Sequence, residues 1–304
     1  MHTRRSFLRI AGTSAAALPF LPTLLRGRPA PVAVDFETLR RGAGIFTARG
    51  GTIGWLVRDG AVVVVDSQFP DSAERCWNGI AERTDRGLDL FINTHHHGDH
   101  TAGNGVFAAQ TDRLVAHANV PDLQRAAADA EEADSLTYPN ETYNEAWSET
   151  IGDETIRLYH NGAAHTGGDT VVHFEEANVA HMGDLVFNRV YPFIDIDGGA
   201  STEGWIDTLE TMHALFDDET ILIHGHGAPD AGITGGRGDL LQMRDFLAAL
   251  RGFVVEGVQA GTAVDELAEV SHIPDFEEYA RDDWPLPLSR CIRAVYREET
   301  ANGG

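Results

Sequence analysis

Short apolar runs and amphipathic stretches alternate along most of this 304-residue chain. Residues 44–69 predict three successive strands, with a hairpin turn at residues 58–60 and an apolar run that ends at Asp66. Residues 72–83 predict a helix, and residues 88–93 predict another buried strand. This order of strands and helices is typical of a layered α/β protein.

The later part of the chain continues this pattern. Strands are predicted in the segments TDRLVAHANV, ETIRLYHNG, TVVHFEEANVAHMGD and ETILIHGHG, and helices in PDLQRAAADAEEA and at residues 204–216 and 238–256. Residues 134–149 predict irregular structure within an acidic, solvated stretch, and the C-terminal remainder is expected to be mostly helical. Since no linker divides residues 34–304, we expect a single domain with a helical C-terminal segment.

The first 33 residues have a different character. Paired arginines, Arg4 and Arg5, precede a modest apolar run at residues 10–25, as in a twin-arginine export signal. Pro19 and Pro22 interrupt this run, which is also short for a membrane span. We therefore expect export by the twin-arginine machinery to the periplasm or beyond, with cleavage near Ala33. An amphipathic helix or an uncleaved membrane anchor is the alternative.

The charge of the chain restricts its partners. Acidic residues outnumber basic ones by 47 to 23, every basic residue is arginine, and the formal net charge is −24. Such acidity argues against binding to nucleic acid or to an anionic membrane and favours a small-molecule partner. The two cysteines, Cys76 and Cys291, either pair outside the cytoplasm or remain as two buried thiols.

The segment INTHHHGDHTAGN, residues 92–104, concentrates metal-binding side chains just after a predicted strand. In an extended segment, residues two apart point to the same side, so His95 and His97 can bind one metal together. Gly98 lets the chain turn, which directs Asp99 and His100 to a neighbouring position. Imidazole and carboxylate ligands suit zinc, manganese or iron.

Two metals need further ligands, and later strand ends supply them. The predicted first site has His95, His97 and His165, the second has Asp99, His100 and His226, and Asp184 bridges the two. A turn-capping role is the alternative for Asp184. We expect His96 to point away from the metals by alternation, and His224 to be structural.

This pattern of ligands resembles the metallo-β-lactamase superfamily over about residues 36–300. The resemblance implies a four-layer αβ/βα sandwich with the metals at one edge. Some β-lactamases have a cysteine ligand near the position of Asp184, whereas the aspartate here resembles the ligand set of glyoxalase II and lactonases. Diiron redox members usually have glutamate in place of the second motif histidine, so His97 argues against that chemistry.

The sequence therefore predicts a binuclear zinc hydrolase, with manganese or iron as alternative metals. A hydroxide bridging the two metals would attack the carbonyl of an ester, thioester, lactone or β-lactam, and Asp99 would orient it and relay a proton. The alternatives are a mononuclear iron sulfur dioxygenase, a non-catalytic metal-dependent binding protein, and hydrolysis of a phosphodiester or sulfate ester. Asn188 and Tyr191, with Phe193, follow Asp184 and either line the substrate mouth or pack in the interior.

Overall fold

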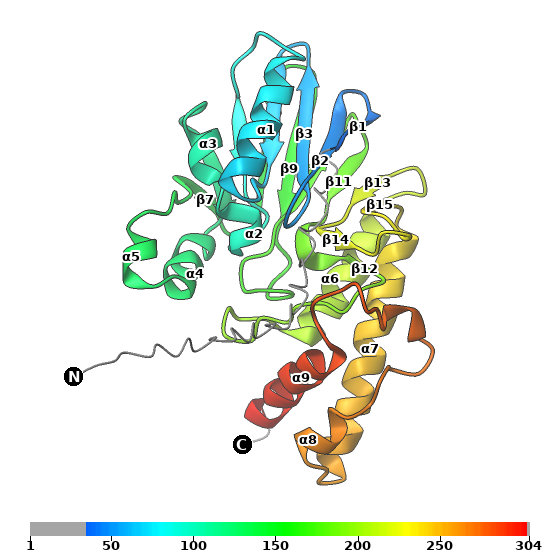
Figure 1. The fold of residues 1–304 in the computed structure, drawn as a ribbon. Helices are drawn as coiled ribbons and strands as arrows, with labels where there is room; N and C mark the ends of the chain where they lie inside the picture. The colour runs from blue at the N-terminus through cyan, green and yellow to red at the C-terminus, as the bar shows by residue number, and fades with distance from the viewer. Residues whose placement is uncertain (1–34, 303–304) are drawn as a thin grey trace, which may run out of the picture. The chain divides into compact units, whose positions relative to one another are not determined.

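Two β-sheets pack face to face in the computed structural model, which describes residues 35–302 (Figure 1). The predicted export signal falls outside the described residues and stays a prediction. The first sheet contains, in spatial order, β1 (Asp35–Arg40), β2 (Ala43–Thr47), β3 (Ile53–Arg58), β4 (Ala61–Val65), β5 (Leu90–Ile92), β6 (Leu114–His117) and β7 (Glu141–Tyr143). Strands β1 to β4 are antiparallel, as the hairpin prediction requires, and β4 to β7 are parallel.

The second sheet is mostly antiparallel. Its spatial order is β15 (Thr234–Gly235), β13 (Ile221–Ile223), β11 (Val179–His181), β10 (Val171–Phe174), β9 (Glu154–Tyr159) and β8 (Ala146–Ile151). Only the β11–β13 pair is parallel within this sheet. Two short strands, β12 (Phe187–Asn188) and β14 (His226–Gly227), form a separate parallel pair close to the site described below.

Strand alternation produces the layers. Val63 and Val65 of β4 pack in the core between the sheets, while Val62 and Val64 pack on the outer face against α1 (Pro70–Ala81) and α3 (Asn104–Ala108). Helices α6 (Thr202–Leu215) and α7 (Gly238–Gln259) cover the outer face of the second sheet, and α9 (Leu288–Asn302) packs against α7 (Figure 1). The predicted four-layer αβ/βα sandwich is therefore confirmed.

Several shorter helices lie in the connections between these layers. They are α2 (Gly98–Thr101), α4 (Val120–Ala127), α5 (Ala130–Ala133), α8 (Val264–Leu267) and the 3₁₀ turns η1 (Gly183–Leu185) and η2 (Glu277–Tyr279). The C-terminal part is less helical than predicted, because residues 268–276 and 280–287 connect α8, η2 and α9 without regular structure. The second of these connections reaches the functional site.

The prediction of irregular structure at residues 134–149 is confirmed for residues 134–140 and 144–145 and was wrong for the remaining positions. Strand β7 and the first part of β8 lie there, and the guanidinium of Arg113 explains how acidic residues are accommodated. It lies 2.8 Å from a carboxylate oxygen of Glu141 and 2.7 Å from one of Glu149. Arg113 immediately precedes β6, and its pairing with both carboxylates offsets part of their charge where this acidic segment joins the sheets.

The two cysteines do not pair. Cys76 is buried between α1 and the first sheet, while the Cys291 thiol donates to the Pro192 carbonyl oxygen at 3.1 Å in the helical layer of the second sheet. Of the two alternatives, the structure thus has two buried thiols. Among residues 35–302, no helix combines the length and apolar character needed to cross a membrane.

Candidate metal centre

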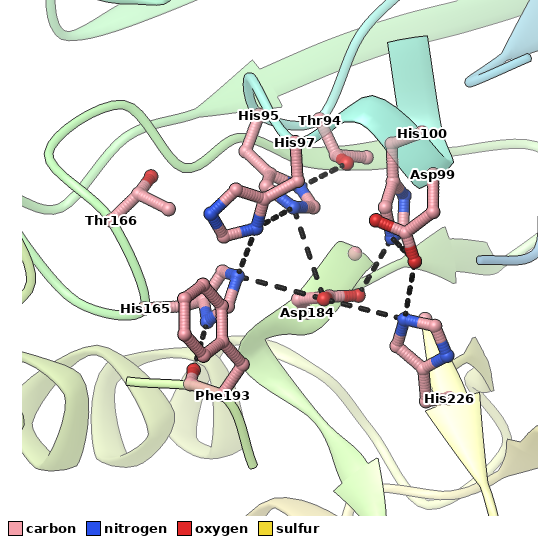
Figure 2. Close-up of polar contacts among 12 residues, drawn as sticks. Thr94, His95, His97, Asp99, His100, His165, Thr166, Asp184, Phe193 and His226 are labelled. Atoms are coloured by element: carbon pink, nitrogen blue, oxygen red, sulfur yellow. Dashed lines mark hydrogen bonds and ion pairs between the residues drawn. The ribbon is translucent and has the colours of Figure 1, made fainter. Parts of the chain in front are cut away.

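The predicted ligands converge because they follow the carboxyl ends of neighbouring parallel strands. Asp66 follows β4 and the loop at residues 95–100 follows the adjacent strand β5. In the facing sheet, Asp184 follows β11 and His226 follows the adjacent strand β13. His165 arrives from the loop between β9 and β10, so four chain segments meet at one edge of the sandwich (Figure 2).

Three histidines and one aspartate form the first group of ligands. The Nδ1 atom of His97 lies 3.0 Å from Nε2 of His95 and 3.0 Å from Nε2 of His165. The Oδ2 atom of Asp184 lies 3.8 Å from Nε2 of His95 and 3.5 Å from Nε2 of His165. These four atoms lie within 4.8 Å of one another, as the donors around one metal ion do.

Asp99, His100 and His226 form the second group, as the sequence predicts. The Oδ2 atom of Asp99 lies 3.2 Å from Nε2 of His226 and 3.9 Å from Nε2 of His100. Asp184 also belongs here, since its Oδ1 lies 2.9 Å from Nε2 of His100 and its Oδ2 lies 3.5 Å from Nε2 of His226. The Asp184 carboxylate therefore lies between the two groups, where a bridging ligand belongs (Figure 2).

Hydrogen bonds to the second ring nitrogen fix which nitrogen each histidine presents. The Phe193 carbonyl oxygen can only accept, so Nδ1 of His165 donates to it at 2.8 Å and Nε2 keeps a free lone pair. The Thr94 hydroxyl donates to Asp66 at 2.7 Å and therefore accepts from Nδ1 of His95 at 3.0 Å. Such partners orient metal-binding histidines and raise their basicity.

Asp66, the predicted acidic strand end, orients His100. Its carboxylate is completely buried and lies 2.7 Å from Nδ1 of His100. It also accepts from the Thr94 backbone N–H at 2.8 Å, which ties the histidine loop to the end of β4. Asp66 itself adopts a left-handed backbone conformation, with φ of 63°. A strained residue at the end of a strand is one device by which a fold aims a functional side chain.

Asp195 performs the same role for His97, and the sequence pattern does not reveal it. Its Oδ2 lies 2.9 Å from Nε2 of His97 and 3.3 Å from Nε2 of His96. Burial would raise the pKa of Asp195, but hydrogen bonds to these two histidines lower it well below its usual range. His97 therefore presents Nδ1 to the first group, whereas His95 and His165 present Nε2. His96 faces Asp195 and lies outside both predicted sites.

A second aspartate that the sequence analysis missed, Asp169, shapes the loop of His165. Its carboxylate accepts from the backbone N–H of Thr166 at 2.8 Å and from the Thr166 hydroxyl at 2.7 Å. Burial raises the pKa of Asp169 to about 7, although both bonds from Thr166 favour the ionised form. Asp169 fixes the turn that carries His165, without contacting the ligand atoms.

The glycine at position 225, directly before His226, is required for a steric reason. A Cβ atom on Gly225 would lie 2.0 Å from Oδ1 of Asp184, which is far inside van der Waals contact. Any side chain at position 225 would therefore displace the carboxylate that lies between the two ligand groups. His224, which we expected to be structural, is fully buried, and its nearest carboxylate is Asp239, 3.7 Å away.

The donor atoms fit divalent metal ions. Nε2 of His100 and Oδ1 of Asp184 are buried and have no hydrogen-bond partner of acceptable geometry among the described residues, although they lie close together. Orphaned buried polar atoms are rare in folded proteins, and a cation between them would satisfy both. Desolvation lowers the pKa of His165 to about 3 and that of His95 well below its usual value, so both are neutral, as metal ligation requires.

The second group carries excess negative charge. Burial would lower the pKa of His226, but the Asp184 charge and the hydrogen bonds that Nε2 of His226 donates to Asp184 and Asp99 raise it to about 9. The pKa of His100 is likewise raised well above its usual value: burial opposes the shift, and the charges of Asp184 and Asp99 outweigh it. These carboxylates attract positive charge to this position, and a bound cation would replace the protons.

A cavity of about 530 Å³ opens directly onto both groups. Its lining residues are Gly50, His97, Gly98, Asp99, Asp184, Phe187, Phe193, His226, Trp284, Pro285, Leu286 and Arg290. The Phe187 ring stacks on the His226 ring with 5.2 Å between centroids. The Trp284 indole N–H donates to the Tyr191 carbonyl oxygen at 2.8 Å, which fixes that wall. The cavity thus joins a polar floor to mostly apolar walls.

Of the residues expected at the substrate mouth, only Phe193 lines this cavity. Asn188 instead donates its amide to the carbonyl oxygens of Ala231 and Gly232, both at 3.1 Å. Tyr191 is buried, with its ring 5.9 Å from that of Phe246. Of the two alternatives for Asn188 and Tyr191, packing is the one that the structure has, since both side chains are turned into the protein.

Comparison with known proteins agrees with this geometry. A family model described as "Metallo-beta-lactamase superfamily" matches residues 47–248. The chain belongs to this superfamily. The match ends before α9, so Trp284 and Arg290 lie beyond the part of the chain that the family model covers.

Two curated relatives are similar in sequence. The "2,4-dinitroanisole O-demethylase subunit alpha" of Nocardioides sp. (strain JS1661) is 25% identical over 77% of this chain and 67% of its own length. The "Metallo-beta-lactamase type 2" of Elizabethkingia meningoseptica is 22% identical over 57% of this chain and 67% of its own length. These names differ in activity, so membership of the superfamily leaves the substrate open.

Solved structures share the fold. The stereoselective inverting sec-alkylsulfatase Pisa1 from Pseudomonas sp. has a TM-score of 0.71 at 15% identity over 87% of this chain, and this chain spans 50% of that protein's length. The DIM-1 metallo-β-lactamase has a TM-score of 0.59 at 18% identity, over 71% of this chain and 97% of its own. At these identities, the likeness establishes the architecture alone.

Proposed function

We propose that this superfamily member is a binuclear metal-dependent hydrolase that cleaves an ester, thioester, lactone or β-lactam, with zinc as its metal and manganese or iron as alternatives. The position of Asp184 is the main support, because one carboxylate reaches histidines of both ligand groups. Two bound divalent cations would supply a water of lowered pKa and a Lewis acid for the carbonyl oxygen.

Asp99 is the residue that we propose for orienting the attacking water and receiving its proton. A third of its side chain is exposed, and it lines the cavity, unlike the fully buried His100 beside it. Burial would raise the pKa of Asp99, but the charge of His100 and the hydrogen bond with His226 lower it to about 2. It is therefore a carboxylate near neutral pH, at the boundary between the metal ligands and the substrate space.

The apolar walls would serve the same reaction. Phe187 and Trp284 exclude water from the side of the cavity next to His226, where the two rings contact the imidazole at centroid distances of 5.2 and 5.6 Å. Exclusion of bulk water strengthens the electrostatic interactions that polarise a carbonyl group. An apolar acyl or aryl group fits such walls better than a strongly hydrated one.

The second ligand group bears on the mononuclear alternative. A mononuclear iron sulfur dioxygenase would use one metal and therefore one group of ligands. In this chain Asp99, His100 and His226 also converge, and Asp184 is shared between the groups. This second convergence favours two metals and hydrolysis.

Hydrolysis of a matched substrate panel tests the proposal. The zinc-loaded protein is expected to hydrolyse aryl esters, thioesters, lactones or a cephalosporin, with loss of activity on chelation and recovery on adding zinc. An aryl methyl ether and a secondary alkyl sulfate serve as comparison substrates. Turnover of only the ether or the sulfate, or oxygen uptake with a persulfide, would contradict the proposed carbonyl chemistry.

A further inference from the structure

Among residues 35–302, Arg290 alone brings a permanent positive charge to the lining of the cavity. This residue lies in the first turn of α9, where its backbone N–H donates to the Pro287 carbonyl oxygen at 3.0 Å. Its side chain lines the same cavity as Asp99, Asp184 and His226. Arg290 lies beyond residues 47–248, so the charge is supplied by the C-terminal segment and not by the part that the family model matches.

The Arg290 side chain is held against the cavity wall. Its guanidinium carbon lies over the Phe193 ring, 4.3 Å from the ring centroid. The Phe193 ring in turn contacts the His97 ring with 5.2 Å between centroids. The Phe193 ring therefore connects the Arg290 guanidinium to the His97 ring, since it contacts both. A planar cation stacked on an aromatic ring keeps its edge N–H groups free to bind an anion.

No partner in the described chain uses those N–H groups. Most described arginines form ion pairs in this acidic protein, as Arg293 does with Asp265 at 2.8 Å one turn later in α9. The Arg290 guanidinium has neither an ion pair nor a hydrogen bond within residues 35–302; its recorded side-chain contact is with Phe193. Of the described arginines without an ion pair, Arg290 alone lines the cavity.

We propose that Arg290 binds a carboxylate on the substrate, while the scissile carbonyl lies at the metal centre. The inference rests on the proposed hydrolysis and narrows its substrate to a molecule with an apolar body and a carboxylate at one end. Phe193 and Trp284 contact the body, and Arg290 pairs with the carboxylate through two N–H groups. Without this charge, the excess of acidic residues in the chain would repel an anionic substrate.

Two esters of equal shape and different charge test this proposal. In the zinc-loaded full chain, Arg290→Ala is expected to raise KM for 4-acetoxybenzoate about tenfold, the loss typical of a charge-assisted hydrogen-bonded pair. The KM for neutral 4-acetoxybenzamide should stay within about twofold, because apolar contacts alone hold it. The KM of Arg290→Lys for 4-acetoxybenzoate should lie between those of the parent chain and Arg290→Ala, since lysine keeps the charge and loses the paired N–H groups. Arg293→Ala on the same helix is the matched control.

Equal changes for both esters, or no change for either, would overturn the carboxylate site. Binding of 4-acetamidobenzoate and 4-acetamidobenzamide, measured by calorimetry, separates this proposal from the hydrolysis proposal. Tighter binding of the benzoate to the parent chain than to Arg290→Ala, with no ester turned over, would support the carboxylate site and contradict hydrolysis. Turnover of the esters without a charge preference would support hydrolysis and overturn the carboxylate site.

Discussion

Replacing Asp184 by asparagine should reduce kcat/KM for an ester substrate by roughly a thousandfold, the scale of losing a principal electrostatic group in an active site. The substitution keeps the size of the side chain and removes the negative charge that lies 2.9 Å from His100 and 3.5 Å from both His165 and His226. An amide has one oxygen with which to replace two carboxylate oxygens, so it cannot serve both ligand groups. The measurement is steady-state hydrolysis together with metal content.

Asp218→Asn is the matched control for this variant. Asp218 is largely exposed and its carboxylate pairs with Arg237 at the surface, so its loss should leave kcat/KM within about twofold. If Asp184→Asn kept two metal ions and more than about a tenth of the parent activity, Asp184 would not act as the shared ligand.

Asp195→Asn should weaken metal binding at the first ligand group by about 10- to 100-fold, while metal at the second group is retained. The carboxylate at 2.9 Å fixes the tautomer of His97 and raises the basicity of its Nδ1. Asparagine can still accept a hydrogen bond from Nε2 of His97, so the fold should be preserved. The dissociation constants would be measured by competition with a chromophoric chelator.

Asp197 supplies the control for Asp195, two residues later in the same loop. Its exposed carboxylate pairs with Arg297 and contacts none of the metal ligands, so Asp197→Asn should bind both metals as the parent does. Equal affinities in Asp195→Asn and Asp197→Asn would show that Asp195 has no influence on the first group. Circular dichroism of both variants would verify that neither has unfolded.

The sequence was sufficient for the layers and for the convergence of the candidate ligands, because both depend on local patterns. The unbroken apolar run at residues 62–65 specifies a strand buried on both faces, and the histidine loop follows a second such strand. Parallel neighbours end at the same edge, so residues after β4 and β5 had to meet. The ligands after β11 and β13 meet for the same reason in the second sheet.

Interactions between distant loops could not be predicted in this way. Asp195 reaches His97 across 98 positions of sequence, and no periodicity marks an isolated aspartate in an irregular loop as the partner of a particular histidine. Trp284 and Arg290 reach the cavity only because an irregular connection and α9 fold back over the site. Substrate-contacting positions depend on such packing, which explains why the sequence left both a cavity position and an interior position open for Asn188 and Tyr191.

The same limit explains why strands β7 and β8 were not predicted within residues 134–149. The acidic composition of this segment suggested a solvated loop, but Arg113, just before β6, pairs with two of its carboxylates. Such pairing between distant residues is a tertiary property, which composition within one segment does not show.

The metal content of the protein tests the central claim most directly. Protein purified without added metal would be analysed for zinc, manganese and iron by elemental analysis, with its concentration determined by amino-acid analysis. Two ligand groups that share Asp184 predict close to two divalent ions per chain, with zinc expected first. A single iron per chain, unchanged after incubation with zinc, would contradict the binuclear hydrolase.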